Sequence, residues 1–369
     1  MLHPLDDYPL HQTSQPISHP ASDSPYVYDR FFFNGYTADG SVFFAVALGV
    51  YPNLRVMDGA FSLIRGGVQY NVRASRRCPE DKTDTSVGPL EIEIVEPMRR
   101  HRITVDDRHG VSADLTMTAI APVIEEPRFV HTVGQRTIFD YTRLTQFGRW
   151  QGWIDLDGER VTIDARVPVV GTRDRSWGVR PVGQPQPGPR SKPQFFWLWA
   201  PTVFDDVCTH IAVNQEADGR AWHESGAVVP RLAAGEPALD PGRVQRGHGT
   251  DFDVTWKPGT RWAERLTTRL GMWGGDDVEV SYEPLLTFQM SGLGYGHPVW
   301  GHGCWVGNDE STRDEIVLAD VDPLDPLMVH VQAMSRATWG DRRGVGVVEQ
   351  LVIGPHQPTG LTGVVDGAA

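Results

Sequence analysis

The sequence predicts an all-β protein built from antiparallel strands, and three observations support this fold class. Apolar and polar residues alternate with period two in many short segments, whereas the spacing of an amphipathic helix is rare. Asp-Gly pairs, which are a strong local signal for a hairpin, stand between such segments. The chain also contains 39 Gly and 28 Pro in 369 residues, which favours a sandwich or a barrel over an α/β fold.

The alternating segments occur along the whole chain, and each has one apolar face, as a strand with one buried face requires. They are "GVQYNVRAS" at 67–75, "LEIEIVEP" at 90–97, "DLTMTAIAP" at 114–122, "HIAVNQE" at 210–216, "DFDVTW" at 251–256 and "LMVHVQAM" at 327–334. The hairpin signals are Asp39-Gly40, Asp157-Gly158 and Asp218-Gly219. Two segments, 127–138 and 261–270, are ambiguous between a strand and a short helix. We therefore expect antiparallel sheets with few short helices.

A chain of this length predicts two domains. The best internal boundary is "PVGQPQPGPRSKP" at 181–193, because its five prolines cannot lie in a central strand. The first 25 residues are polar and contain several prolines, which is typical of an arm that lies on the surface or is partly disordered. We therefore predict an arm over residues 1–25, one β domain over 26–185 and a second over 186–369.

The charge of the chain restricts its partners. It has 34 Lys and Arg against 47 Asp and Glu, for a formal net charge of −13, so the molecule as a whole repels nucleic acids and anionic membrane surfaces. No apolar run is long enough to span a bilayer, and the first 25 residues lack the basic start and apolar core of a secretory signal. These features predict a cytoplasmic protein without nucleic-acid partners, and a homodimer is compatible with them.

The sequence contains no signal for a cofactor. The cysteines Cys78, Cys208 and Cys304 stand singly, and no metal-ligand spacing or nucleotide-binding motif is present. The loop "GLGYGHPVWGHG" brings His297 and His302 close in sequence, but their separation is not a recognised metal spacing. We expect no metal and no cofactor. The two histidines are either loop residues bonded to the backbone or, with Trp300 between them, contacts for a ligand.

Tryptophan is concentrated in the later part of the chain, since all 12 tryptophans lie from position 150 onward. The segment "QFFWLWAP" places Trp197 and Trp199 on one face of a strand and Phe196 and Leu198 on the other. This pattern has two interpretations: a strand buried on both sides, or a strand that forms part of the wall of an aromatic cavity for a hydrophobic ligand.

The densest group of charges is "VVGTRDRSWGVRPVG" at 169–183, where Asp174 stands between Arg173 and Arg175. One interpretation is an ion-paired corner of the fold. The other is a catalytic acid, which requires Asp174 to face an apolar pocket where desolvation raises its pKa. The flanking arginines would oppose that shift, and the orientation of the side chains decides between the two interpretations.

At these residues the sequence resembles a known family. The segments "TRLTQFGRWQGWIDLDGERVTID", "GTRDRSWG" and "FFWLWAPTVFDDVCTHIAVNQEADGR" resemble the two-domain lipocalin-like (calycin) family of carotenoid 1,2-hydratases and AttH-like proteins. The family motif is close to Asp-His-Glu-Trp/Phe-Gly. Asp174, Trp177 and Gly178 match it, whereas Arg175 and Ser176 replace its His and Glu. The resemblance covers residues 140–220 and implies two antiparallel lipocalin-like β-barrel or sandwich domains.

The resemblance also implies an activity, the addition of water to an isolated alkene of a hydrophobic isoprenoid or prenyl chain without a cofactor. A carboxylic acid protonates the alkene, aromatic faces stabilise the carbocation, and water captures it. In this sequence Asp174 is the candidate acid. The candidate catalytic residues are Asp174, Arg175 and His210. The candidate substrate-binding residues are Trp177, Trp197, Trp199, Asp205, His297, Trp300 and His302.

These observations lead to one leading function and two alternatives. The leading function is a cofactor-independent hydratase or isomerase-type lyase that acts on a hydrophobic isoprenoid, steroid or polyketide-like substrate. The first alternative is a non-catalytic carrier of such a molecule. The second is an interaction module, which fits the acidic surface but does not explain the aromatic residues.

Overall fold

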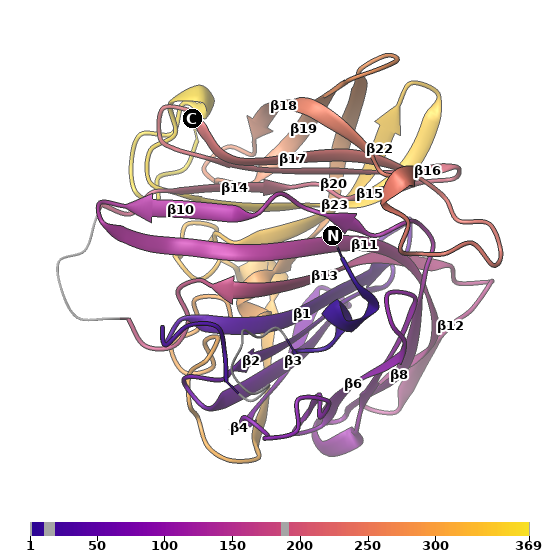
Figure 1. Ribbon diagram of the computed structural model, residues 1–369, viewed down its shortest axis with the longest axis vertical. Coiled ribbons are helices and arrows are strands. Elements are labelled where there is room, and N and C mark those ends of the chain that lie inside the picture. Colours follow the sequence, from indigo (N-terminus) through magenta and orange to yellow (C-terminus); the bar gives the residue numbers. More distant parts are fainter. Residues whose placement is uncertain (1, 11–18, 186–191, 369) are drawn as a thin grey trace.

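The computed structural model describes residues 2–10, 19–185 and 192–368. Within them every paired strand is antiparallel and the helices are short 3-10 turns, which confirms the all-β prediction (Figure 1). The helical turns are η1 (Pro4–Asp7), η2 (Asp107–His109), η3 (Pro241–Arg243), η4 (Met290–Leu293), η5 (Leu318–Asp320) and η6 (Gln357–Thr359). In the described ranges, none of these helices has the length and apolar character needed to cross a membrane.

The first sheet is an open, curled sheet that contains the N-terminal strands. Its main path runs in the order β21-β4-β3-β2-β1-β13-β11-β8-β7-β6-β5, and β9, β10 and β12 pair with the long strand β11. Its strands are β1 (Val27–Tyr36), β2 (Phe43–Tyr51), β3 (Val56–Arg65), β4 (Val68–Arg77), β5 (Ser86–Val87), β6 (Leu90–Glu96), β7 (Arg100–Val105), β8 (Val111–Ala119), β9 (Ile124–Glu125), β10 (Phe129–Val133), β11 (Arg136–Leu156), β12 (Glu159–Ile163), β13 (Val169–Val179) and β21 (Glu310–Val317).

The second sheet closes into a barrel, because β17 pairs with both β16 and β18, while β14 and β15 each bridge β16 and β23. Its strands are β14 (Phe195–Trp199), β15 (Thr202–Phe204), β16 (Val207–Gln215), β17 (Ala221–Pro230), β18 (Gln245–Trp256), β19 (Ala263–Met272), β20 (Val278–Gln289), β22 (Val331–Trp339) and β23 (Arg342–Ile353). The two segments that were ambiguous in sequence, 127–138 and 261–270, lie mainly in β10, β11 and β19.

The three predicted Asp-Gly turns all connect antiparallel neighbours, namely β1 with β2, β11 with β12, and β16 with β17. Both turn residues have positive φ only at Asp157-Gly158, where φ is 51° and 88°. The other two pairs lie in longer connections, in which only the glycine needs a left-handed conformation.

Strand β21 joins the first sheet although it comes late in the chain, since it pairs with β4 along its whole length. The predicted domain limits therefore do not coincide with the membership of the two sheets, and the division at residues 25 and 185 stays a prediction. Residues 1 and 11–18 of the predicted arm, and residues 186–191 of the predicted boundary, lie outside the described residues.

The predicted arm contributes one buried charge to the first sheet. Asp7, at the end of η1, is fully buried. Its carboxylate accepts a hydrogen bond from Arg173 Nη1 at 2.6 Å and one from the backbone N–H of Met98, and it lies 3.1 Å from His101 Nε2. Burial raises the pKa of Asp7, but Arg173 and His101 outweigh that effect and hold it well below its usual range.

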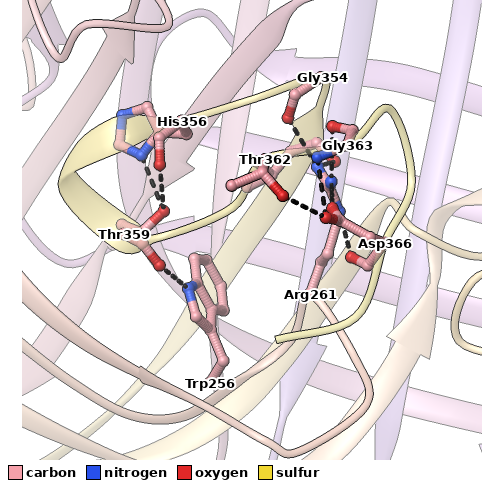
Figure 2. A network of polar contacts seen from close by, with 9 residues as sticks. Trp256, Arg261, Gly354, His356, Thr359, Thr362, Gly363 and Asp366 are labelled. Atoms are coloured by element: carbon pink, nitrogen blue, oxygen red, sulfur yellow. Dashed lines mark hydrogen bonds and ion pairs between the residues drawn. The ribbon is translucent and has the colours of Figure 1, made fainter. Parts of the chain in front are cut away.

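The C-terminal segment is tied to the second sheet by Arg261, whose side chain is fully buried (Figure 2). Its guanidinium donates to the carbonyl oxygens of Asp366, Gly354 and Gly363 at 2.7, 2.8 and 3.0 Å, and it forms an ion pair with the Asp366 carboxylate. Trp256 Nε1 also donates to the carbonyl oxygen of Thr359 at 3.2 Å. One arginine therefore satisfies backbone acceptors that no strand pairing reaches.

A third apolar cluster lies between the two sheets, in addition to one core inside each of them. Even-numbered residues of β1, such as Phe32 and Tyr36, belong to it, as do Trp197 and Trp199 of β14. Phe31 and Phe33 face the interior of the first sheet, and Phe196 and Leu198 face the interior of the barrel. The sheets thus pack face to face, and β1, β11, β13 and β14 line their interface (Figure 1).

Candidate functional site

Strand β13 separates the charges of the sequence motif onto two faces, because side chains alternate along a strand. Arg173 and Arg175 face the interior of the first sheet. Arg173 Nη1 bonds Asp7, and its Nε donates to Gln146 Oε1 at 2.8 Å. Arg175 forms an ion pair with Asp29 and lies 4.0 Å from the ring centroid of Phe31. In this structure both arginines form buried ion pairs that link β13 to other segments, Arg173 to η1 and Arg175 to β1.

Asp174 faces the other way, into a cavity of about 660 Å³ at the interface of the sheets. Six aromatic side chains contribute to the wall of this cavity, and they are Phe32, Phe139, Tyr141, Phe195, Trp197 and Tyr295. The polar side chains along it include Arg30, Arg143, Asp174, Ser176, Arg180, Asn214, His297, His302, His330 and Glu349. A volume and lining of this kind suit a small ligand that is largely apolar with a few polar groups.

The Asp174 carboxyl makes no hydrogen bond or ion pair with any other residue that the structure describes. The pKa of Asp174 is raised from 3.8 to about 6, because burial and, to a smaller extent, Glu349 raise it more than Arg143 and Arg30 lower it. A carboxyl with this pKa is half protonated near pH 6 and keeps a protonated fraction at neutral pH, and this fraction can act as a general acid.

The backbone conformation at position 178 explains why the sequence motif has a glycine there. Gly178 adopts φ +138°, a conformation that L side chains rarely adopt, and a Cβ there would meet the Tyr141 Cα at 2.7 Å. The glycine thus allows β11 and β13 to pair closely beside the cavity.

Arg143 of β11 is held against the cavity wall by a buried carboxylate. Its Nε and Nη2 donate to Glu126 at 2.8 and 2.6 Å, and the Thr145 hydroxyl donates to the same carboxylate at 2.7 Å. His210 Nε2 lies 3.4 Å from Glu126 and 3.2 Å from Trp199 Nε1. Burial raises the pKa of Glu126, but Arg143 and His210 hold it well below its usual range. Glu126 is therefore a fixed counter-ion.

The guanidinium of Arg143 also lies over aromatic faces, with its Cζ 4.7 Å from the Trp197 ring centroid and 4.9 Å from that of Phe129. The bidentate ion pair and the ring contacts together fix its plane. Arg143 is thus a rigid part of the wall next to Asp174.

Glu349 of β23 is a second buried carboxylate at the cavity. It accepts hydrogen bonds from Trp197 Nε1 at 2.9 Å and Gln332 Nε2 at 2.6 Å, and His330 Nε2 lies at 2.9 Å. Burial raises its pKa, but the hydrogen bonds from His330, Gln332 and Trp197 outweigh this effect and the pKa is lowered. Glu349 therefore stays ionised, whereas Asp174 can be protonated in the same cavity.

The histidine-bearing loop closes one side of the cavity. Arg30 Nη1 lies 2.8 Å from His302 Nδ1, and His302 Nε2 lies 2.9 Å from the carbonyl oxygen of Leu293. Because arginine can only donate and a carbonyl can only accept, His302 is neutral with its proton on Nε2. Burial and the nearby Arg30 and Arg180 hold the pKa of His302 well below its ordinary value. Tyr295 packs edge-on against His302 and lies under Arg30.

The structure brings together four of the predicted site residues, since Asp174, Trp197, His297 and His302 all line the cavity. Trp199 and His210 lie one layer behind, where they contact Arg143 and Glu126. The others lie elsewhere. Arg175 and Trp177 are on the opposite face of β13, Asp205 lines a separate groove, and Trp300 contacts His297 through its backbone N–H. The functional roles of all these residues stay predictions.

Several cavity residues were missed by the sequence analysis, among them Arg30, Arg143 and Glu349. Arg30 of β1 and Arg143 of β11 both pair with Ser176 of β13. Their position at the cavity therefore follows from the pairing register of these three strands, which the sequence analysis did not predict. Glu349 had a local signal, because it is a charge inside the apolar run "GVGVVEQLVI" at 344–353.

His297 and His302 are the two residues for which a metal site was considered in the sequence and not expected. Within the described ranges, no three residues among His, Cys, Asp and Glu are grouped so that they could hold a metal ion. Both ring nitrogens of His302 are hydrogen-bonded, Nδ1 to Arg30 and Nε2 to the carbonyl oxygen of Leu293. His297 Nδ1 accepts a hydrogen bond from the backbone N–H of Trp300 at 3.0 Å. Both ring nitrogens of His302 and Nδ1 of His297 are therefore engaged within the protein.

The chain matches a family of unknown function, DUF8625, over residues 2–362, and no curated protein matches it. Among solved structures, an AttH-like protein from Nitrosomonas europaea has 14% sequence identity and a TM-score of 0.52, with 88% of this chain and 92% of that chain covered. Kievitone hydratase from Nectria haematococca has 13% identity and a TM-score of 0.50, with 88% of each chain covered. These similarities confirm the predicted fold class of two lipocalin-like antiparallel units.

Proposed function

Since this chain belongs to DUF8625, a family of unknown function, we propose a function from its own cavity: cofactor-independent hydration or isomerisation of an alkene in a hydrophobic isoprenoid, steroid or polyketide-like molecule. The observation that carries the proposal is the position of Asp174, a carboxyl with a pKa of about 6 that faces a partly aromatic cavity and bonds no described neighbour. A protein of similar fold is a hydratase by name, which agrees with this chemistry.

The first step is protonation of the substrate. The π pair of the alkene takes the proton from the Asp174 carboxyl, one carbon gains a C–H bond, and the more substituted carbon becomes cationic while Asp174 becomes a carboxylate. Trp197, Phe32 and Tyr141 present aromatic rings to the cavity, and such rings stabilise a cation. Glu349, held as an anion by its hydrogen bonds, supplies a fixed negative charge on the wall.

The second step completes either reaction without any other reagent. In hydration, water forms the C–O bond and its proton returns to the Asp174 carboxylate, so the acid is regenerated. In isomerisation, the carboxylate instead removes a proton from a carbon next to the cation, and the double bond is moved. In both routes Asp174 gives one proton and takes one proton back, so no other acid or base is needed.

A mass-spectrometric assay tests this function. The full chain is incubated with prenylated phenols, terpenoid alkenes and steroids in D₂O and, separately, in H₂¹⁸O. We expect deuterium at an alkene carbon, and ¹⁸O in the product if water is added. Asp174→Asn should still bind the accepted compound, measured by quenching of tryptophan fluorescence, while turnover falls by about 10²–10⁴-fold.

Two results decide against the proposal. Turnover by Asp174→Asn at the wild-type rate would exclude Asp174 as the acid. Binding of these compounds by the wild type without isotope incorporation would favour a carrier of lipophilic molecules instead. Asp206→Asn is the matched control, because Asp206 is exposed and pairs with Arg342 at 3.1 Å, away from the cavity.

A further inference from the structure

Two arginines at the cavity, Arg30 and Arg180, form no ion pair with a carboxylate among the residues that the structure describes. The buried arginines in the described part of the chain are Arg30, Arg73, Arg143, Arg173, Arg175 and Arg261. All except Arg30 form an ion pair with a carboxylate among those residues. A buried cation without a counter-ion is costly, so Arg30 requires an explanation.

Arg30 is only 2% exposed, and it is held in place by groups that carry no negative charge. Its Nη1 bonds the neutral ring of His302, and its Cζ lies 4.7 Å from the Tyr295 ring centroid. Its Nε and Nη2 are buried and have no hydrogen-bond acceptor among the residues that the structure describes. The Arg30 guanidinium is thus fixed at the cavity wall, and its Nε and Nη2 groups are available as hydrogen-bond donors.

Arg180 stands at the same part of the cavity, directly after β13. Its guanidinium Cζ lies 4.4 Å from the Tyr28 ring centroid, and its buried Nη2 also lacks an acceptor within the described ranges. Arg30 and Arg180 both act on the pKa of His302 and of Asp58, which places the two cations around the same loop. No described carboxylate lies within ion-pair distance of Arg180.

The nearby carboxyl groups do not fill this role. Asp58 accepts hydrogen bonds from Tyr51 Oη at 3.1 Å and from the N–H of Gly303 at 2.7 Å, and burial raises its pKa to about 6. Asp174 has a pKa of about 6 as well, with burial as the main cause. Neither carboxyl lies within ion-pair distance of Arg30 or Arg180.

We propose that Arg30 and Arg180 form a subsite for an anionic oxygen of the bound molecule, such as a carboxylate or an ionised phenol or enol, with His302 and Tyr295 holding Arg30 in position. The substrate class is then a lipophilic alkene that carries an acidic oxygen group. The proposed function supplies the identification of this molecule as a substrate, whereas the anion subsite stands on the arginines themselves.

This subsite also removes an electrostatic conflict. A carbocation in a cavity that carries two uncompensated arginines would be opposed by their charge. An anion bound between them neutralises that charge before the alkene is protonated. It also orients the molecule, because one end is fixed at the arginines and the apolar part lies along the aromatic wall near Asp174.

Two fluorescent probes with nearly the same ring system test the subsite. One is 1-anilinonaphthalene-8-sulfonate, an anion, and the other is N-phenyl-1-naphthylamine, which is neutral. We expect the wild type to bind the anion more tightly. Arg180→Met should weaken binding of the anion by about 10–100-fold, as expected for loss of a charged hydrogen bond, and should leave binding of the neutral probe nearly unchanged.

Two further variants keep the result interpretable. Arg180→Lys should recover part of the preference for the anion, provided that thermal melting shows all variants to be folded. Arg166→Met removes an exposed arginine that pairs with Asp164, and it should bind both probes as the wild type does. Equal affinity of the wild type for the two probes, or an equal loss of both in Arg180→Met, overturns the subsite.

Different results would contradict the anion subsite and the proposed function, so the two can be tested independently. Asp174→Asn should keep the preference for the anionic probe. If the preference is present but no alkene exchanges deuterium, the anion subsite stands and the hydratase proposal falls. If alkenes without an acidic oxygen are turned over as fast as acidic ones and the preference is absent, the hydratase stands and the subsite falls.

Discussion

Asp174 and Arg175 are neighbours in the chain, but their side chains lie on opposite faces of β13. Arg175 pairs with Asp29 inside the first sheet, whereas Asp174 faces the cavity between the sheets. The arginines that do influence Asp174 are Arg143 and Arg30, which come from the two strands beside it. The environment of the proposed acid is therefore set by strand pairing and not by its sequence neighbours.

The pKa of Asp174 predicts a pH-dependent effect on stability. Its folded pKa of about 6 lies above the ordinary value of 3.8, so the folded protein binds this proton more tightly, and the stability from it is lost as the pH rises toward 6. Asp174→Asn should therefore be more stable than the wild type at pH 8, by at most about 3 kcal/mol, and this advantage should disappear below pH 4. Urea unfolding at both pH values measures it.

Asp206→Asn is the control for this effect because its sign is opposite. The hydrogen bond from Arg342 lowers the pKa of Asp206, so its stabilising contribution is present at neutral pH and is lost on acidification. The variant should be slightly less stable than the wild type at pH 8 and equal to it at low pH. An Asp174→Asn variant that follows the same course as Asp206→Asn would contradict the raised pKa.

The charge of Glu349 should act on Asp174 through the cavity. Burial is the main reason for the raised pKa of Asp174, and Glu349 adds to it. In a Glu349→Gln background, the pH at which Asp174→Asn gains its advantage should move to a lower value. The difference in unfolding free energy between Glu349→Gln and the double variant, measured against pH, gives this midpoint. Glu283→Gln, an exposed change on β20, should leave the midpoint in place.

The Glu126 carboxylate should be essential for the buried Arg143. Glu126→Gln removes the negative charge and leaves the guanidinium buried without a counter-ion, at an expected loss of about 3–5 kcal/mol of unfolding free energy. Glu159→Gln tests a matched but exposed pair with Arg65, whose atoms lie 2.7 Å apart, and should lose at most about 1 kcal/mol. Equal losses in the two variants would show that Glu126 is not a required counter-ion.

The Arg261 network should hold the C-terminal segment on the barrel. Arg261→Met leaves several carbonyl oxygens without their donor, so we expect a loss of about 3 kcal/mol or more and faster amide hydrogen exchange over residues 354–368. Arg269→Met is the control, because Arg269 pairs with Asp253 and Glu279 on the exposed face of the second sheet. Unchanged exchange in Arg261→Met would contradict the tie shown in Figure 2.

The fold was predictable because its signals are local. Alternating segments and Asp-Gly pairs are each a property of fewer than ten residues, and Phe196 and Trp197 show that even a strand apolar on both faces can be recognised as lying between two cores. The same alternation could have placed Asp174 away from Arg173 and Arg175, since neighbours in a strand point to opposite sides.

The site was less predictable because its charges meet only through pairing of distant strands. Glu126 precedes β10, Arg143 lies in β11 and His210 in β16, so no spacing in the sequence reports their contact. The family motif drew attention to Trp177, but this side chain lies on the face opposite the cavity. A motif identifies a strand well, while the direction of each side chain depends on the register.

The late arrival of β21 has a consequence for how the chain folds during synthesis. Strand β4 remains an open edge, with unpaired backbone donors and acceptors, until the ribosome has made the chain as far as Val317. An exposed edge can pair with another nascent chain. A fragment that stops before residue 310 keeps this edge of β4 unpaired, so we expect it to aggregate more readily than the full chain.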